Sequence, residues 1–396
     1  MNLYNKNLFV YSFAFYLIII FLSLDMCLPS LPSMAIELGF SQSMAQYTLS
    51  AWFLGSASVQ LILAPIADYY GRRVVLLSGT IIFVLATVWC GMLDNYVLIL
   101  ISRFLQGATV CSALVAGYAT VHDSFKGNRA IQIMAILSTI TVLSPALGPL
   151  LGAFIVSIYS WRSVFFLLSI LGLISLCCHF YIMPETKSND AKLGLKNIVH
   201  DYKTIFLNKR FMQLVLVNFL LTSMFFIWLI ETPFIVIDHL GKSAIYFGMI
   251  QMPVFAGFIV GGQITRAIIN KLDVYLVIKI GLIVVSVGAI LFALSAYFML
   301  SIGFCLVGMT AIAIGAAMTF GPFNRLTIES SNAPMGSRVA LSSLATSLCG
   351  FFASIVVGLL DVATFFNIAA LICGVVSLAV IIYLMIEKKQ PDLVRF

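Results

Sequence analysis

The stretch PETKSNDAKLGLKNIVHDYKTIFLNKR, residues 184–210, divides the chain into two halves of nearly equal length. It is the longest polar stretch in the sequence, and we interpret it as a linker with a short amphipathic helix at about residues 193–206. On both sides of it, long apolar runs alternate with short polar loops. The organisation of the molecule therefore follows from these runs.

The composition indicates that lipid surrounds most of the chain. Of its 396 residues, 62% are hydrophobic and 9% are charged, whereas soluble domains have about 25% charged residues. A membrane-spanning helix needs about 20 mostly apolar residues. The sequence has twelve such runs, at about 8–31, 45–67, 74–93, 96–120, 130–157, 162–183, 211–237, 244–269, 273–296, 298–322, 338–360 and 362–386. Because the runs are continuous, they predict spanning α-helices and not the alternating strands of a barrel.

Six runs precede the polar stretch and six follow it, which predicts an internal duplication. We expect an N-terminal six-helix bundle at 1–183, a cytoplasmic linker at 184–210, and a C-terminal six-helix bundle with a short cytoplasmic tail at 211–396. The fold class is therefore an all-α integral membrane protein with 12 transmembrane helices in two six-helix bundles.

The basic residues predict the orientation. With both termini in the cytoplasm, Arg162 and Lys242 lie outside and Arg103 lies within a helix, so the remaining 19 of the 22 lysines and arginines lie on the cytoplasmic side. This distribution fits the positive-inside rule. Because the charges are spread over many short loops, they argue against nucleic-acid binding.

The loop between the second and third runs reads LAPIADYYGRRVVLL, residues 63–77. Gly71 permits a tight turn, and the two arginines after it, Arg72 and Arg73, anchor the cytoplasmic end. Asp68 can cap a helix or form an ion pair with an arginine. Asp123, which follows the fourth run, is a candidate partner for either arginine.

Two further segments carry unusual residues within apolar runs. LISRFLQGATVCSA, residues 100–113, contains Arg103, and a charge at this depth is expected to face a cavity or an acid. SPALGPLLGA, residues 144–153, combines small residues that allow close helix packing with prolines that allow a bend. Its key residues are Pro145, Gly148, Pro149 and Gly152.

These three segments resemble the loop signature, the fourth-helix motif and the fifth-helix antiporter motif of the major facilitator superfamily, in the order that the family has them. Ala64 stands in place of one usual glycine, and Ser144 and Ala153 stand in place of two others. DMCLPSLP, residues 25–32, resembles the end of helix one in Bcr/CflA-type drug:proton antiporters, and WRSVFFL, residues 161–167, also fits this type.

The resemblance implies the major facilitator fold, in which helices one and four of each bundle line a central cavity. In the family, the loop signature latches the two halves in the outward-facing state. The fifth-helix motif marks drug and proton antiporters and is thought to seal the substrate path against leaks. The C-terminal half carries only a degenerate loop, GGQITRAIINKLD, which is expected to latch less tightly.

Three charged residues are predicted to face this cavity. Asp25 and Arg103 lie about six and seven residues from the outer ends of the first and fourth helices, so a close ion pair between them is expected. Glu231 lies at similar depth in the seventh helix, the counterpart of the first, and Pro233 follows it as Pro29 follows Asp25. Both prolines are expected to mark flexible outer tips.

Two carboxyl groups and one guanidinium leave one acid without a basic partner. Removal from water favours the neutral form of a carboxyl group, so such an acid can carry a proton. We therefore predict that Asp25 is the principal proton carrier, that Arg103 tunes it, and that Glu231 helps to carry protons or to bind a cationic substrate. Polar and aromatic side chains at similar depth are expected to line the substrate cavity, namely Trp52, Ser56, Gln60, Phe225, Trp228, Gln251 and Phe255.

The predicted function is a proton-coupled secondary transporter, an antiporter that exports small organic compounds or drugs by alternating access. A dedicated exporter of one metabolite or siderophore is an open alternative, and the motifs do not fix the direction of transport. A membrane-embedded enzyme or a receptor is the alternative of another class. The sequence has no H-E-x-x-H or nucleotide-binding loop, so we expect neither an enzyme nor a cofactor or metal. We expect a monomer in the bacterial inner membrane that meets lipid, protons and a small-molecule substrate.

Overall fold

The computed structural model describes residues 3–125, 127–185, 195–299, 301–360 and 364–389. In these ranges the chain is helical and contains no strand, which confirms the all-α fold class. The helices are α1 (Leu3–Asp25), α2 (Leu31–Leu38), α3 (Gln42–Val59), α4 (Leu63–Tyr70), α5 (Arg72–Met92), α6 (Tyr96–Ser112), α7 (Tyr118–Ser124), α8 (Gly127–Ile158), α9 (Arg162–Ile182), α10 (Leu195–Leu207), α11 (Lys209–Pro233), α12 (Ala244–Ile268), α13 (Val274–Tyr297), α14 (Ile302–Glu329), α15 (Met335–Leu360) and α16 (Phe365–Lys389).

The spans agree with the twelve apolar runs. Over the described ranges, eleven helical segments are long and apolar enough to cross a membrane. The pair α3 and α4, which is bent by 56° at the break between them, makes a twelfth when it is counted as one span. Lipid offers no hydrogen bonds to a backbone, so helices of this length satisfy their own polar groups as they cross.

Prolines shape the first and seventh spans differently. The first span breaks after Asp25 into a short 3₁₀ turn, Leu28–Ser30, and resumes as α2 with Pro32 in its first turn, where no amide donor is needed. Pro233 was expected to mark a similar tip. There the chain instead continues from α11 into a wider π-helical turn, Phe234–His239, which is one way for a helix to absorb a proline.

One predicted boundary differs clearly from the structure. The run predicted at 298–322 corresponds to α14, which begins at Ile302 and continues to Glu329. The added turns mix polar and apolar residues, and an ion pair between the Nε atom of Arg325 and the Oε1 atom of Glu329, at 2.8 Å, supports them. A helix can therefore extend past the apolar stretch that reveals it.

The chain forms two compact units. The first contains residues 1–195 and 242–248, and the second contains residues 196–241 and 249–396. The predicted linker includes residues 186–194, which lie outside the described residues, so the predicted domain boundaries stay a prediction. The amphipathic helix expected at about 193–206 corresponds to α10, which belongs to the second unit.

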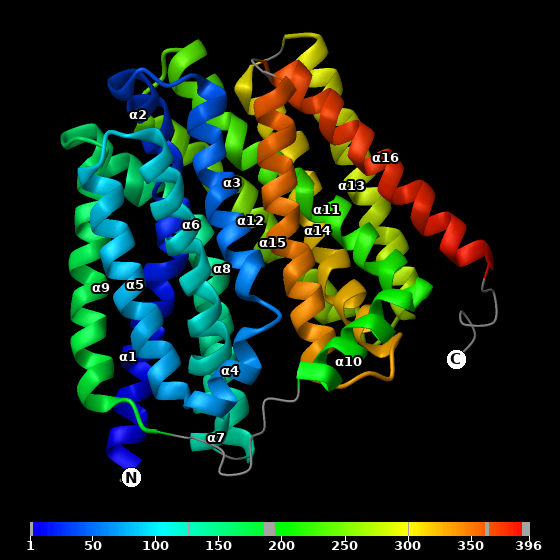
Figure 1. Cartoon of the computed structure of the whole chain (residues 1–396). Helices are drawn as coiled ribbons and strands as arrows, with labels where there is room; N and C mark the ends of the chain where they lie inside the picture. Colours follow the sequence, from blue (N-terminus) through cyan, green and yellow to red (C-terminus); the bar gives the residue numbers. More distant parts are fainter. Residues whose placement is uncertain (1–2, 126, 186–194, 300, 361–363, 390–396) are drawn as a thin grey trace. The chain divides into compact units, whose positions relative to one another are not determined.

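Each unit has its own packing order. In the first unit, α1 packs against α8 and α9, α5 packs against α6 and α9, and α3 packs against α6 (Figure 1). In the second unit, α11 packs against α14, α15 and α16, and α13 packs against α14 and α16. This arrangement places α6, which carries Arg103, against α5, and α8 against the end of α1, where Asp25 lies.

Candidate functional site

Asp25 is buried at the point where the first span breaks. It is the last residue of α1, and its exposed fraction is 3%. Pro29 and Pro32 lack the amide hydrogen that a continuous helix needs, so the helix gives way to the 3₁₀ turn just beyond Asp25. The backbone of Asp25 thus belongs to the end of α1, and the 3₁₀ turn separates it from α2.

Helix α8 lies directly against this break. A Cβ atom added to Gly148 would lie 2.3 Å from the Cβ atom of Asp25, and one added to Gly152 would lie 2.3 Å from the carbonyl oxygen of Met26. Only glycine permits such a close approach of two helices. The hydroxyl of Ser144, one turn before Gly148, donates to the Oδ2 atom of Asp25 at 3.5 Å.

Arg103 does not form the expected ion pair with Asp25. The side chain is 1% exposed, and its Nη1 atom donates to the carbonyl oxygen of Ser23 at 3.1 Å. Ser23 lies in the last turn of α1, where backbone carbonyls lack donors within the helix. The break in the span therefore supplies an acceptor for the arginine, and among the ion pairs of the described residues there is none within 4.0 Å between Arg103 and Asp25.

Two neighbouring helices orient the guanidinium of Arg103. Its Nη1 atom also donates to the amide oxygen of Gln106, whose Nε2 atom donates to the hydroxyl of Thr87 on α5 at 2.9 Å. The Cζ atom of Arg103 lies 5.8 Å from the ring centroid of Phe165 on α9. In the described part of the chain, its Nε and Nη2 atoms are buried without a hydrogen-bond partner. The guanidinium is thus held on one side and has donors to spare on the other.

Glu231 is fully buried in the second unit, with an exposed fraction of 0%. One turn before it, Trp228 donates from its Nε1 atom to the amide oxygen of Gln251 on α12 at 2.8 Å. The Trp228 ring packs on Phe292 and Phe365, with centroids 5.8 Å and 6.1 Å apart. Glu231 is therefore a buried acid one turn after a tryptophan that packs within an aromatic group.

The other predicted cavity residues occupy different surroundings. Trp52 and Ser56 are buried on α3 and Gln60 is buried directly after it, and the thiol of Cys111 on α6 donates to the side-chain oxygen of Gln60 at 3.0 Å. Gln60 therefore already has a partner inside the first unit.

In the second unit, the remaining predicted wall residues lie near Trp228. Phe225 is half-buried, and its ring packs edge-on against Phe258 with centroids 5.5 Å apart. Gln251 and Phe255 are buried on α12, and the Nε2 atom of Gln251 has no partner among the described residues. The structure thus brings Trp228 and Gln251 together by a hydrogen bond.

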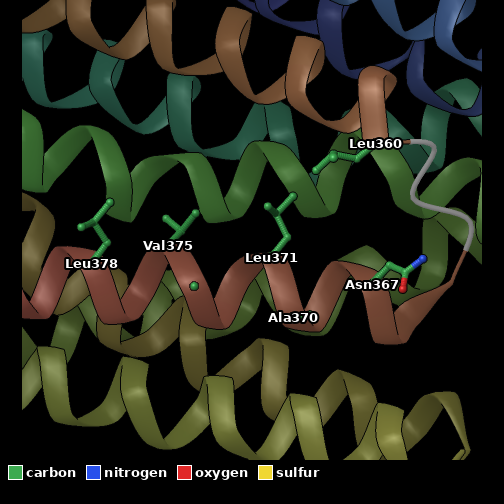
Figure 2. Close-up of a pocket in the computed structure, with 7 residues that line it drawn as sticks. Leu360, Asn367, Ala370, Leu371, Val375 and Leu378 are labelled. Carbon is green, nitrogen blue, oxygen red and sulfur yellow. The ribbon is translucent and has the colours of Figure 1, made fainter.

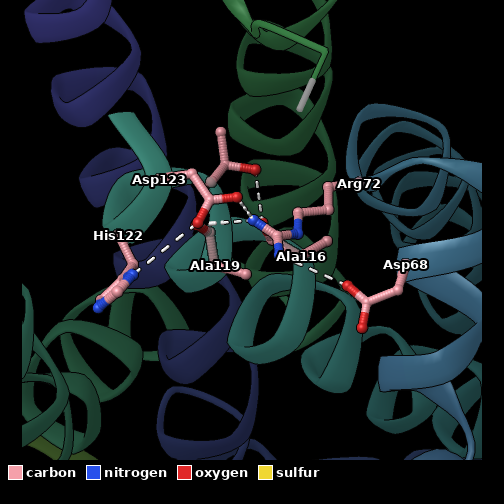
Figure 3. Close-up of polar contacts among 7 residues, drawn as sticks. Asp68, Arg72, Ala116, Ala119, His122 and Asp123 are labelled. Carbon is pink, nitrogen blue, oxygen red and sulfur yellow. Dashed lines mark hydrogen bonds and ion pairs between the residues drawn. The ribbon is translucent and has the colours of Figure 1, made fainter. Parts of the chain in front are cut away.

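Ion pairs join three of the predicted latch residues, Asp68, Arg72 and Asp123, and these three with Gly71 and Arg73 are here called the latch cluster. Figure 3 shows Arg72 between the carboxylates of Asp68 and Asp123. Arg72 also donates to the carbonyl oxygen of Ala119 at 3.0 Å, so it joins α4, α5 and α7.

The other two latch positions have separate tasks. Gly71 has φ of +105°, a backbone conformation that residues with a side chain rarely adopt. It allows α5 to start one residue after α4 ends. Arg73 donates to the carbonyl oxygen of Phe180 at 2.6 Å, near the end of α9.

A second charged cluster in the first unit was not identified from the sequence. Arg162, at the start of α9, forms ion pairs with Glu37, near the end of α2, and with Asp94, in the turn between α5 and α6. The indole Nε1 atom of Trp161 donates to Glu37 at 2.8 Å. The available signal is charge alone: Arg162 is one of two basic residues predicted outside, and both acids lie in segments predicted on that side.

A groove of about 480 Å³ lies along α16, in the second unit. Figure 2 shows its lining side chains, which come from α16 and the end of α15. They are Leu360, Asn367, Ala370, Leu371, Gly374, Val375 and Leu378. None of these is a predicted site residue, and the mostly apolar lining suits a hydrocarbon chain more than a charged ligand.

Comparison with known proteins gives consistent relatives. The chain is 31% identical over 337 residues to the chloramphenicol resistance protein CraA of Acinetobacter baumannii, which covers 85% of this chain and 81% of that protein. It is 28% identical to the multidrug transporter MdfA of Edwardsiella piscicida, over 96% and 93% of the two chains. It is 29% identical to the multidrug resistance protein MdtM of Salmonella typhimurium, over 83% and 79%.

A solved structure supports the same fold. The crystal structure of a bacterial homolog to the human lysosomal transporter Spinster, in an inward-facing and unoccupied conformation, matches with a TM-score of 0.69 at 14% identity. The match covers 96% of this chain and 93% of that one. The model of the Major Facilitator Superfamily matches residues 13–354. The chain therefore belongs to the Major Facilitator Superfamily and is a multi-pass membrane transporter, not an enzyme.

Proposed function

We propose that this protein exports small organic compounds, antibacterial drugs among them, in exchange for protons. The proposal is supported by relatives that are named for chloramphenicol resistance and multidrug transport. It is also supported by the acids buried within membrane-spanning helices. An ionisable residue at this depth costs stability, so such residues are rare and mark functional sites.

The observation that carries the proposal is the surroundings of Asp25. Its carboxyl group is buried, its recorded polar contact is the neutral hydroxyl of Ser144, and the described residues place no cation within 4.0 Å of it. A buried carboxyl group without a cation is stable when it is neutral. It therefore takes up a proton in this state and releases it when the surroundings change.

The remaining residues have supporting roles in this proposal. Arg103, with unpartnered donors on a buried guanidinium, stabilises the ionised form of Asp25 when the proton leaves. Glu231 carries a second proton or binds the charge of a cationic drug. The latch cluster and the α8 residues Pro145, Gly148, Pro149 and Gly152 govern the conformational change. The substrate contacts are Trp52, Ser56, Gln60, Phe225, Trp228, Gln251 and Phe255.

The membrane potential supplies the driving force for this exchange. Each elementary charge that crosses 100 mV contributes about 2.3 kcal/mol, which corresponds to more than a tenfold concentration ratio. One proton per drug molecule therefore suffices for measurable export. We further propose that the protein works as a monomer in a bacterial inner membrane, with both termini in the cytoplasm.

The test is a comparison of drug resistance and transport in bacterial cells that lack their own drug exporters. Cells that produce the wild-type protein are expected to tolerate more chloramphenicol, and everted vesicles from them to show drug-evoked proton movement. Asp25→Asn is isosteric and has no proton to exchange, so both responses should disappear at equal protein amounts.

A matched control separates this result from damage to the fold. Glu329→Gln changes an acid that lies at the end of α14, with a side chain that is 56% exposed. It should leave both responses unchanged. Full resistance and full proton movement in Asp25→Asn would contradict the proposal. Export of a single compound, with no effect on a panel of drugs, would instead indicate a dedicated metabolite exporter.

A further inference from the structure

Four residues of the first unit form a compact charged group, here called the Arg162 cluster: Glu37, Asp94, Trp161 and Arg162. The guanidinium of Arg162 bridges the two carboxylates and stacks on the ring of Trp161, with its Cζ atom 4.2 Å from the ring centroid. The indole of Trp161 donates to the same carboxylate of Glu37 that Arg162 binds. The cluster lies beyond the end of α5 that is opposite to Arg72.

The Arg162 cluster has more interacting groups than a single surface ion pair, namely two carboxylates, one guanidinium and one indole. A single exposed ion pair contributes little, whereas a guanidinium that bridges two carboxylates in a network contributes more. Here the two carboxylates come from different elements, and Trp161 is 1% exposed and so fixes one side of the guanidinium. The network therefore ties the end of α2 to the start of α9 and to the α5–α6 turn.

The ion pair between Arg162 and Glu37 holds the end of the segment that follows Asp25. This segment, residues 26–38, is held at its start by α8, through the contact of Gly152 with Met26, and at its end by Glu37. Between these points Leu28, Leu31 and Met34 are buried, with exposed fractions of 2%, 0% and 1%. Residues 26–38, here called the plug, thus carry buried apolar side chains directly after Asp25 and are fixed at both ends.

A second connection runs from the cluster to Arg103. The ring of Trp161 packs edge-on against Phe165, with centroids 5.9 Å apart, and the Cζ atom of Arg103 lies over the same Phe165 ring, 5.8 Å from its centroid. Arg103 in turn donates to the carbonyl oxygen of Ser23, two residues before Asp25. Contiguous contacts of this kind can carry coupling between two sites.

We propose that Arg162 is a positioning residue for proton exchange: through Glu37 and Asp94 it holds the plug of residues 26–38 in place and so prevents protons outside the cell from reaching Asp25 when no drug is transported. This inference rests on the proposed function of Asp25 as a proton carrier. It assigns to an arginine on the predicted outer side a role in keeping the exchange coupled.

The experiment measures passive proton entry into proteoliposomes that contain the full-length protein and a trapped pH-sensitive dye. An inward proton gradient is imposed without drug. Wild type should admit protons slowly, and Arg162→Gln should admit them about fivefold faster, as expected when one charge network no longer biases a closed state. Arg162→Lys keeps the charge without the planar fork, so its rate should be intermediate.

The decisive variant combines Arg162→Gln with Asp25→Asn. If the leak passes through Asp25, the double variant should return to the wild-type rate, which a general loosening of the fold would not do. Lys242→Gln, at the other basic residue predicted outside, is the matched control and should not leak. Glu37→Gln tests the same network from its other side and should also leak, should Arg162→Gln prove too unstable to purify.

Two results would overturn the inference. One is a wild-type rate in both Arg162→Gln and Glu37→Gln, and the other is a leak that persists unchanged in the double variant. Failure of the proposed function is visible separately, because drug-evoked proton movement would then be absent in wild type. If wild type shows that movement and the single variants do not leak, only the role of Arg162 is rejected.

Discussion

At the scale of single residues, the proposed proton site depends on which buried polar atoms of Arg103 and Asp25 have hydrogen-bond partners. Arg103 satisfies two acceptors, the carbonyl of Ser23 and the amide of Gln106, and retains buried donors that have none in the described chain. Asp25 has the opposite imbalance, since its contact is a neutral hydroxyl. In the proposed function Arg103 stays charged and Asp25 alternates between its protonated and ionised forms.

The first prediction concerns the geometry of Arg103. Arg103→Ala should abolish drug-evoked proton movement in everted vesicles, because it removes the only charge proposed to stabilise ionised Asp25 and takes the Arg103 donor away from the amide oxygen of Gln106. Arg103→Lys should retain a partial response, since the charge persists while the bidentate fork is lost. Arg325→Ala, at a side chain that is 63% exposed, is the control and should behave as wild type. A full response in Arg103→Ala would contradict the role of this residue.

The second prediction concerns stability at Trp228. Trp228→Phe removes the indole donor and leaves the amide oxygen of Gln251 buried without it. An unpaired buried acceptor costs about 1–3 kcal/mol, whereas removal of both polar partners is nearly neutral. Thermal unfolding of purified protein should therefore show a lower Tm for Trp228→Phe, and part of the loss should be recovered in Trp228→Phe/Gln251→Leu. Equal Tm values for wild type and Trp228→Phe would show that this hydrogen bond adds no stability.

At the scale of elements, the contact between α8 and the end of α1 determines where Asp25 lies. Gly148 and Gly152, one turn apart on α8, meet the Cβ atom of Asp25 and the carbonyl oxygen of Met26. The helices therefore touch backbone to backbone at the break. A movement of α8 would therefore also move Asp25. The contact requires small residues at positions 148 and 152, because a side chain there would push the two helices apart.

The third prediction follows from that contact. Gly148→Ala adds a methyl group where only 2.3 Å separates the new Cβ atom from the Cβ atom of Asp25, so α8 must shift. Drug-evoked proton movement should fall by at least tenfold, and Tm should drop as expected for overpacking by about 1–3 kcal/mol. Gly262→Ala, on α12, is the control because an added Cβ atom meets nothing within 4 Å there. Unchanged transport in Gly148→Ala would show that the close approach is dispensable.

The sequence predicts elements well and their mutual contacts incompletely. Spans are visible because about 20 apolar residues in a row have one physical explanation, and the fold class is confirmed. The prediction of an ion pair between Asp25 and Arg103 is wrong for this structure. Equal depth in the membrane does not determine which way two side chains point. The contact between Glu37 and Arg162 was missed because 125 residues separate them, and no local pattern carries that information.

At the scale of the whole molecule, the number of spans and the distribution of basic residues together predict on which side of the membrane the two termini lie. An even number of crossings returns the chain to the side from which it started. If the bent pair α3 and α4 is counted as one span, the described residues have twelve, and we propose from the positive-inside rule that both ends lie in the cytoplasm. The Arg162 cluster then lies outside and the latch cluster inside.

The fourth prediction tests this orientation. A green fluorescent protein fused after Phe396 should fluoresce, because it folds in the cytoplasm, and alkaline phosphatase at the same place should be inactive. The same reporters inserted beside Lys242, in the loop before α12, should give the reverse pattern. Active phosphatase at the C-terminus would contradict the proposed topology and, with it, the proposed direction of proton flow.

The central claim is that Asp25 gives up a proton when a drug binds, and a direct measurement is available. Purified protein in weakly buffered detergent solution receives chloramphenicol, and a pH indicator records the protons released. We predict release from the wild-type protein that scales with the amount of protein, and none from Asp25→Asn that is equally folded by its Tm. Equal release from both proteins would contradict the claim, because the proton would then come from another group.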